Sequence, residues 1–296
     1  MKFKQIFILN ITLFLLVEWI SAYFIGGVLG VVSWWGIMGG SIAGVIITLA
    51  ILIVFIIKLI RRNKITRYLI IAFFLCVIMA FPFCWFLHIG NLAYPASIKA
   101  TKPAVSIELP FDEAVKVGWG GNDIKTNQPH VVVPNERWAY DFIMNPHSIK
   151  SKNLNDYGIY NKEIIAPIKG KIVGAYDKEK DILPGSEDNE TMIGNYIYIK
   201  IEETDTYLVL AHIKQGSILV KKGQVVEVGT PLARVGNSGS TSEPHLHIHH
   251  QRQNPVETSM FLTEGLPLYF HHINGKSMPV GGENGDIISP KGKSKS

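Results

Sequence analysis

The hydrophobic positions of this 296-residue chain are concentrated in its amino-terminal third. No charged residue occurs in residues 24–57 or in residues 68–94, whereas a helix needs only about 20 apolar residues to cross a bilayer. We therefore predict a membrane region over residues 1–90, with three spanning helices at about residues 6–23, 37–57 and 68–87. A cleavable signal peptide is the alternative interpretation of the first 24 residues, and the two later spans would still anchor the chain.

Charge is distributed as unevenly as hydropathy. The chain has 29 basic and 24 acidic residues. Seven of the basic residues and one acidic residue, Glu18, lie before position 95, so 22 basic and 23 acidic residues lie beyond it. The net charge of +5 therefore gives no support to a nucleic-acid partner. The seven basic residues precede the first span or separate the second from the third: Lys2, Lys4, Lys58, Arg61, Arg62, Lys64 and Arg67. By the positive-inside rule the amino terminus is cytoplasmic, and three spans place the rest outside the cytoplasm.

Beyond a predicted linker at residues 91–107, short apolar runs alternate with polar positions and are separated by Gly, Pro, Asn or Asp. The runs predict strands at residues 130–133, 137–143, 163–166, 171–176, 196–201, 207–212, 217–220, 231–235 and 244–249. This spacing is typical of an all-β barrel or sandwich, which we place at residues 108–274. Residues 275–296 are rich in Gly, Ser and Lys, and we expect them to be disordered.

The stretch that most constrains function is residues 235–248, where a glycine-punctuated loop runs into a strand with two histidines. Because side chains alternate along a strand, His245 and His247 share a face, about 6 to 7 Å apart. That separation is too large for both to bind one small ion at about 2.0 to 2.1 Å, so we expect one metal ligand and one proton carrier. His249 shares this face and is a further candidate. A surface strand that happens to be rich in histidine is the alternative.

Two other segments offer partners for this strand. The strand predicted at residues 207–212 ends in His212, immediately before a turn, where functional side chains are commonly presented. Residues 130–142 are typical of a hairpin with Pro134 and Asn135 in its turn, which would place His130 across from Asp141. Cross-strand partners have Cβ atoms about 4.5 to 5.5 Å apart, which suits two ligands of one ion. A register slip of one residue would instead leave an ordinary polar pair on the surface.

Together these segments resemble the lysostaphin-type (LytM-like) zinc metallopeptidases over about residues 119–251. The resemblance is carried by Ala139-Tyr140-Asp141-Phe142, Ala166-Pro167, Gly170-Lys171-Ile172-Val173, Gly194-Asn195-Tyr196, residues 207–212, Gly223, Gly229, Gly236-Asn237-Ser238-Gly239 and Pro244-His245-Leu246-His247. It implies an all-β domain related to barrel-sandwich hybrids, a Zn²⁺ ion, and the peptides of peptidoglycan as substrate. It also implies that Asp141 and His247 are metal ligands and that His212 and His245 are the catalytic pair.

One departure from the family pattern concerns the first metal ligand. Arg137 stands where the family usually has a histidine, and an arginine cannot lose its proton to bind a metal. Either His130 supplies the missing ligand beside Asp141 and His247, or the site is incomplete and inactive.

The sequence thus favours a membrane-anchored zinc metalloendopeptidase that cleaves peptide cross-links of peptidoglycan outside the cytoplasm. The first competing hypothesis is a catalytically inactive module of the same fold that binds cell wall or regulates another hydrolase. A lipoyl-like or phosphocarrier barrel ranks below it, because the lysine hairpin of a lipoyl carrier is missing.

Overall fold

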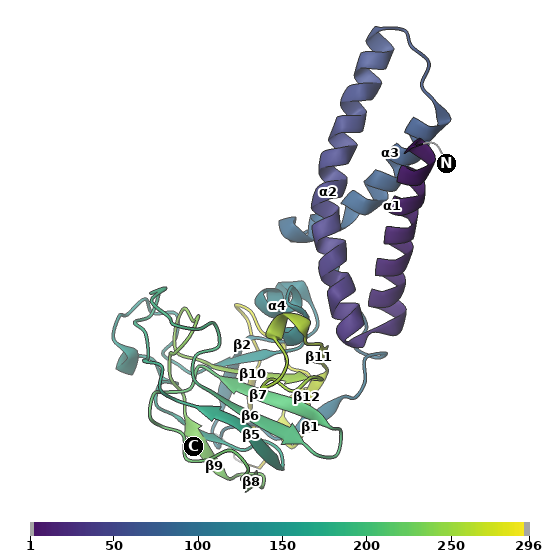
Figure 1. Ribbon diagram of the computed structural model, residues 1–296. Helices are drawn as coiled ribbons and strands as arrows, with labels where there is room; N and C mark the ends of the chain where they lie inside the picture. The colour runs from purple at the N-terminus through teal and green to yellow at the C-terminus, as the bar shows by residue number, and fades with distance from the viewer. Residues whose placement is uncertain (1–2, 293–296) are drawn as a thin grey trace. The chain divides into compact units, whose positions relative to one another are not determined.

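The computed structural model describes residues 3–292 and divides into two compact units, Met1–Ala96 and Ser97–Ser296 (Figure 1). The boundary falls inside the linker predicted at residues 91–107. The first unit is helical and the second is built mainly from β-strands. This order of an α-helical region followed by an all-β domain is the one that the sequence predicts.

The first unit contains three apolar helical stretches. Helix α1 (Phe3–Ile20) continues into the π-helical turn η1 (Ser21–Ile25), α2 spans Gly27–Ile60, and α3 (Arg67–Ala80) continues into the 3-10 helix η2 (Phe81–Leu87). The stretches contain 23, 34 and 21 residues, so each is long and apolar enough to cross a membrane. Helix α2 begins at Gly27 rather than near residue 37, because its early glycines do not interrupt the helix.

Glycines on α2 let the other two helices approach closely. A Cβ atom added at Gly40 would lie 2.8 Å from the ring of Phe14 on α1, and one added at Gly44 would lie 2.6 Å from the backbone nitrogen of Ala80 at the end of α3. These glycines are four residues apart and therefore share a helix face. Small residues in this spacing are the usual means of bringing apolar helices into backbone contact.

The second unit is organised around one large sheet and two small ones. The main sheet has ten strands in the order β13-β14-β2-β3-β10-β7-β6-β5-β8, with β11 paired to β10, and this path does not close into a barrel within the described residues. Strand β1 pairs in parallel with β12, and β4 pairs antiparallel with β9. The strands are β1 (Val105–Ile107), β2 (Val115–Trp119), β3 (Tyr140–Ile143), β4 (Glu163–Ile165), β5 (Gly170–Tyr176), β6 (Tyr196–Ile201), β7 (Thr206–Ala211), β8 (Val225–Val226), β9 (Pro231–Arg234), β10 (Leu246–Gln251), β11 (Gly265–Leu266), β12 (Leu268–Phe270), β13 (Ile273–Asn274) and β14 (Ile287–Pro290). The short helices are α4 (Ile124–Val131), η3 (Pro134–Glu136), η4 (Leu154–Asp156) and η5 (Met260–Leu262).

Strand β10 lies between β3 and β7, and its two faces have different roles. Leu246 and Ile248 are fully buried and belong to the main hydrophobic core, together with Phe142 on β3 and Leu210 on β7. Because side chains alternate along a strand, the intervening positions, beginning with His247, face the other way. The packing of one face therefore determines which side chains the other face presents.

Two of the strands that the sequence predicts do not form. Residues 217–220 form no strand, and residues 130–133 end helix α4 instead of forming a hairpin with residues 137–143. The side chain of Asn127 explains the second difference, because its amide donates to the carbonyls of Gly121 and Ala139 at 3.0 and 3.1 Å and holds this segment in place. These buried hydrogen bonds override the β-propensity of residues 130–133.

The carboxyl-terminal segment is also more ordered than its composition indicates. Strand β14 pairs antiparallel with β2, and Ile288 is buried in the main core. The glycine-rich loop before it is closed by Asp286, whose Oδ2 accepts a hydrogen bond from the backbone of Val280 at 2.9 Å. The prediction of disorder is therefore wrong for residues 275–292, because the exposed edge of β2 supplies backbone partners that composition does not reveal. Residues 293–296 lie outside the described part of the chain.

The glycine contact between α2 and α3 can be tested by substitution. We expect Gly44→Ala to destabilise the helical unit by about 1 to 3 kcal/mol, because the new methyl group would overlap the backbone of α3. Thermal unfolding of the full chain in detergent, followed by helical circular dichroism, measures this. Gly39→Ala is the matched control: nothing lies within 4 Å of that position, and alanine should add up to about 1 kcal/mol of helix propensity. Equal unfolding temperatures for the two variants would contradict the proposed close approach.

His250 lies on the core face of β10 and is a structural histidine. It is 1% exposed; its Nε2 accepts from the hydroxyl of Thr206 at 2.7 Å, and its Nδ1 donates to the carbonyl of Pro267 at 3.1 Å. Burial lowers its pKa to about 4. Between pH 6.5 and pH 4 the unfolded chain binds this proton and the folded domain does not, so the stability of the domain falls as pH decreases through this window.

We predict that His250→Gln removes part of this acid sensitivity. From pH 6.5 to pH 4 the wild-type domain should lose about 3 kcal/mol more unfolding free energy than the variant, because glutamine has no proton to gain. Denaturant unfolding of the full chain at both pH values, followed by tryptophan fluorescence, checks this. His147→Gln replaces a half-buried histidine and should change the pH dependence much less. Parallel pH profiles for wild type and His250→Gln would refute the assignment.

Candidate functional site

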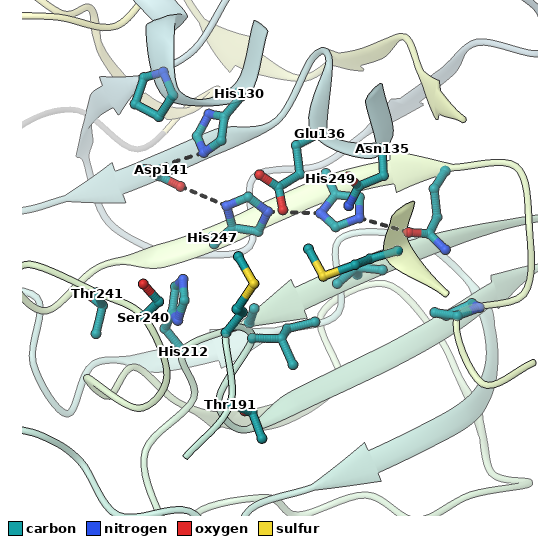
Figure 2. A pocket seen from close by; sticks show the side chains of 18 of the residues that line it. His130, Asn135, Glu136, Asp141, Thr191, His212, Ser240, Thr241, His247 and His249 are labelled. Carbon is teal, nitrogen blue, oxygen red and sulfur yellow. Dashed lines mark hydrogen bonds and ion pairs between the residues drawn. The ribbon is translucent and has the colours of Figure 1, made fainter. Parts of the chain in front are cut away.

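The centre of the site is a row of residues across three adjacent strands. His247 on β10 lies directly opposite Asp141 on β3 and Ala211 on β7. The Nδ1 atom of His247 is 2.9 Å from Oδ1 of Asp141. His212 follows Ala211, and its positive φ of 60° ends the regular strand at that point. Figure 2 shows His130, Asp141 and His247 pointing toward one another, with His212 nearby.

His130 reaches this row from helix α4. Its Nε2 atom is 3.4 Å from Oδ2 of Asp141, and its Nδ1 atom is 2.7 Å from Oδ1 of Asn127. The amide nitrogen of Asn127 already donates to two backbone carbonyls, so its oxygen can only accept, and the proton of His130 lies on Nδ1. Nε2 therefore faces Asp141; it donates to the carboxylate when the ring is protonated and offers a lone pair when the ring is neutral. The expected proximity of His130 and Asp141 is found, although a helix and not a hairpin produces it.

A chain of hydrogen bonds along β10 orients His247. The amide nitrogen of Gln251 donates to the carbonyl of Gln253 at 2.7 Å, so its oxygen accepts the Nε2 proton of His249 at 2.9 Å. Burial lowers the pKa of His249 well below its usual value, so this ring is neutral and its Nδ1 accepts from Nε2 of His247 at 2.8 Å. The chain leaves Nδ1 of His247 as the nitrogen that faces Asp141.

His212 and His245 border the same centre, with ring centroids 4.6 Å apart. Nδ1 of His212 donates to the carbonyl of Ser238 at 2.8 Å, and Nδ1 of His245 donates to the carbonyl of Glu243 at 2.8 Å. Since a carbonyl can only accept, both rings in their neutral form carry the proton on Nδ1. Their Nε2 atoms are left for the site, and Nε2 of His245 lies 3.7 Å from Oδ1 of Asp141.

The glycine loop before β10 supplies the carbonyl that orients His212. Gly194 has a φ of +65°, and a Cβ atom there would lie 2.3 Å from the carbonyl oxygen of Ser238. The hydroxyl of Ser238 accepts from the backbone of Asn195 at 2.9 Å and donates to the carbonyl of Ile213 at 2.8 Å. A glycine is thus required at position 194 for the two loops to approach this closely.

The charges of the site follow from burial and from contacts between its members. Burial alone would raise the pKa of Asp141, but the charges of His130 and His245 and hydrogen bonds from His130 and His247 hold it well below its usual range. Burial lowers the pKa of His212 well below its usual value, and the charges of His245 and His247 add to this effect. Burial opposes the charge on His247, yet its hydrogen bond to Asp141 raises the pKa overall. Asp141 is therefore held as a carboxylate and His212 as a neutral ring, while the contact with Asp141 favours the protonated form of His247.

Two overlapping groups of side chains could hold a metal ion here. The ligand atoms of His130, Asp141 and His247 all lie within 4.8 Å of one another, and so do those of Glu136, His247 and His249. In the second group Nε2 of His247 is hydrogen-bonded to His249, whereas Nδ1 in the first group faces a carboxylate. Two imidazoles and one carboxylate with an open fourth position form the donor set of a catalytic zinc site.

Arg137, where the family pattern would place a ligand, has a different role. Its guanidinium donates to the backbone carbonyl of Asn122 at 3.0 Å and to the side-chain oxygen of that residue at 3.2 Å, and it lies 4.9 Å from the ring centroid of Trp138. Burial lowers its pKa to about 10, although Asp123 opposes this shift. These contacts anchor the loop between α4 and β3 and belong to neither ligand group.

Three residues of the site were not found by sequence reasoning: Asn127, Glu136 and Gln251. Gln251 continues the alternation of His247 and His249, so the strand pattern contained a signal for it. Asn127 lies within α4 and Glu136 ends η3, where the sequence predicts a hairpin, and no local pattern identifies them.

The site lies at the floor of a cleft with a volume of about 610 Å³. Its walls combine the histidines with apolar side chains such as Trp119, Met192 and Met260 and with polar ones such as Thr191 and Ser240. A concave, mostly apolar site with a few convergent polar groups is typical of substrate binding.

Known proteins provide an independent comparison. Residues 156–258 match the family model described as Peptidase family M23. Among solved structures, lysostaphin from Staphylococcus simulans is 20% identical, with 51% of this chain and 47% of that chain covered and a TM-score of 0.32. The catalytic domain of that protein is 22% identical, with 51% and 88% covered and a TM-score of 0.32. A zinc containing peptidase from Vibrio cholerae is 21% identical, with 50% and 37% covered and a TM-score of 0.33.

This chain therefore covers about half of the length of full-length lysostaphin. A search of curated proteins found no match. The family match includes His212, His245 and strand β10 with His247, and it ends before the short helix η5. Residues 156–258 are thus similar to Peptidase family M23, and three helices that are long and apolar enough to cross a membrane precede them in the chain.

Proposed function

We propose that this chain is a membrane-anchored zinc endopeptidase that hydrolyses peptide bonds of peptidoglycan outside the cytoplasm. The observation that carries the proposal is the convergence of ligand atoms from His130, Asp141 and His247 within 4.8 Å at the floor of the cleft. The match to Peptidase family M23 supports hydrolysis of a peptide bond. Peptidoglycan as the substrate rests on the resemblance to the lysostaphin-type enzymes and on the outward orientation that the basic residues favour.

The residues present fit a zinc ion. Ligand atoms around a tetrahedral zinc ion lie about 3.3 Å apart, given bonds of about 2.0 to 2.1 Å. Asp141 lies 2.9 Å from Nδ1 of His247 and 3.4 Å from Nε2 of His130, so small movements would form the site. Asn127 and His249 already direct the required nitrogen of each ring at the centre. Such outer hydrogen bonds are the usual means of orienting histidine ligands.

His212 and His245 are suited to proton transfer beside this ion. When bound, zinc supplies a Lewis acid that makes water more acidic and polarises a carbonyl group. We assign His212 as the base that takes a proton from the attacking water on Nε2, because burial keeps this ring neutral. His245, fixed through Glu243, would act in its doubly protonated form. Its Nε2–H would stabilise the negative charge that develops on the carbonyl oxygen and pass that proton to the leaving amine, while His212 keeps the proton of the water until both rings exchange protons with solvent.

The amino-terminal helices support a role near the cell surface. The loop between α2 and α3 carries Arg61, Arg62 and Lys64, which the positive-inside rule assigns to the cytoplasmic side. With three spans, the β domain then lies on the opposite side. Tethering increases the concentration of the enzyme near an insoluble polymer without a need for tight binding.

Zinc content and activity together test the proposal. We expect the full chain in detergent to hold zinc and to release peptides from purified peptidoglycan, with activity abolished by a chelator. His130→Ala, Asp141→Ala and His247→Ala should each lose the zinc ion of this site together with activity, because each removes a ligand. His212→Ala and His245→Ala should keep zinc and lose activity by about 100-fold or more, because each removes a proton carrier. Elemental analysis and chromatography of the released fragments provide the two readouts.

The control is Asp205→Ala, which removes an exposed carboxylate that pairs with Lys200 at the surface. It should match the wild type in zinc content and in activity. A wild-type chain without zinc, or one that holds zinc and binds peptidoglycan without cleaving it, would instead support the inactive binding module.

The hydrogen-bond chain along β10 makes a separate prediction. Gln251→Leu should weaken zinc binding by about 10- to 100-fold, because His249 loses the acceptor that fixes its proton and hence the orientation of His247. Competition with a chromophoric chelator measures the dissociation constant of the full chain. Gln215→Leu makes the same replacement at an exposed residue on another loop and should leave zinc affinity unchanged. Wild-type affinity in Gln251→Leu would show that the chain does not orient the ligand.

A further inference from the structure

A second group of metal-ligating side chains lies outside the cleft, where strands β1 and β12 end. Glu108 directly follows β1, and His271 and His272 directly follow β12. The ligand atoms of these three residues lie within 4.8 Å of one another. None of the three lines the cleft that contains Asp141. The peptidase site therefore does not account for them.

Both imidazoles face one carboxylate oxygen. Nδ1 of His272 is 2.5 Å from Oε1 of Glu108, and Nε2 of His271 is 3.2 Å from the same oxygen. The two ring centroids are 4.5 Å apart. Nδ1 of His271 is buried without a hydrogen-bond partner among the described residues, so Nε2 is the nitrogen that this ring offers to an ion. Two nitrogens and one carboxylate oxygen are again a donor set that zinc accepts.

The backbone is shaped to bring these rings together. Neighbouring side chains in an extended strand point to opposite faces, so two consecutive histidines would normally diverge. Here His272 has a φ of +51°, a left-handed conformation that costs a non-glycine residue about 1 kcal/mol or more. It is held by hydrogen bonds from the backbone of His271 to Ile107 at 2.9 Å and from the backbone of Lys291 to His272 at 2.6 Å.

We propose that Glu108, His271 and His272 form a second zinc-binding site outside the cleft. The side chains are 26%, 41% and 69% exposed, so an ion can enter from solvent and keep water in its fourth position. The contact at 3.2 Å already matches the spacing of about 3.3 Å between ligands of a tetrahedral ion, and the exposed ring of His272 can move outward to open the shorter contact.

A bound ion would connect three separate parts of the chain. Glu108 lies at the end of the first strand after the linker, and the two histidines join β12 to β13. The backbone bond from Lys291 to His272 extends the connection to the segment that follows β14. The ion would therefore fasten both the first and the last strands of the domain to one point. A ligand that binds only the folded state raises its stability.

Zinc stoichiometry in four proteins tests the site, each prepared as the full chain in detergent. We expect two zinc ions in the wild type, one in Asp141→Ala, one in His272→Gly and none in the double variant. In the Asp141→Ala background, zinc at about 100 times its dissociation constant should raise the unfolding temperature of the domain by about 5 °C, and His272→Gly should abolish this shift. Glycine adopts a positive φ without strain, so this variant should fold without the ion.

The matched control is His88→Gly, because His88 is also an exposed histidine with a positive φ, of 54°, and belongs to no candidate ligand group among the described residues. It should keep both zinc ions and the temperature shift. If His272→Gly holds as much zinc as its parent in both backgrounds, the cluster is an ordinary surface ion pair and the proposal is overturned. Failure of the peptidase proposal would appear separately, as a zinc content that Asp141→Ala does not change.

Discussion

The register of β10 between β3 and β7 is the constraint on which the site depends. It places His247 opposite Asp141 on one side and Ala211, the neighbour of His212, on the other. A slip of one residue would turn the histidine into the core and place an isoleucine in the cleft. Leu246 and Ile248 prevent this slip, because both are fully buried in the main hydrophobic core. Apolar packing on one face therefore holds the polar site on the other.

Hydrogen-bond direction adds a second level of control. Each of the four imidazoles around Asp141 has one nitrogen bonded to a group outside the centre: Asn127 for His130, Ser238 for His212, Glu243 for His245 and His249 for His247. In three cases the partner can only accept, and in the fourth a buried glutamine determines the direction. The remaining nitrogens of His130, His245 and His247 lie 3.4, 3.7 and 2.9 Å from carboxylate oxygens of Asp141. The strand order brings the rings together, and these partners decide which atom each ring presents.

The sequence was informative where the required signal is local. Strand alternation predicts that His245 and His247 share a face. The short apolar runs predict strands whose bounds closely match those of β5, β6 and β7. The sequence predicts that His130 lies beside Asp141, but it assigns this contact to a hairpin. No hairpin forms, because hydrogen bonds from the Asn127 side chain to Gly121 and Ala139 hold this segment as helix α4. Strand β14 was missed because its stability comes from pairing with β2, which lies more than 150 residues earlier in the sequence. Such long-range partners leave no periodic signature.

The composition of the cleft floor argues for chemistry over passive binding. A buried carboxylate and neighbouring imidazoles must each find a partner, and well-packed apolar residues would fill the same space at lower cost in stability. The site also requires a left-handed His212 and a close backbone approach at Gly194, both of which restrict the sequence without adding to the core. A module that only recognised cell wall would gain nothing from Nε2 of His130 and Nδ1 of His247 converging on one carboxylate. A metal ion that needs an oxygen and two nitrogens accounts for this convergence, and the proposed proton carriers His212 and His245 beside it are what distinguish the hydrolase proposal from an inactive module.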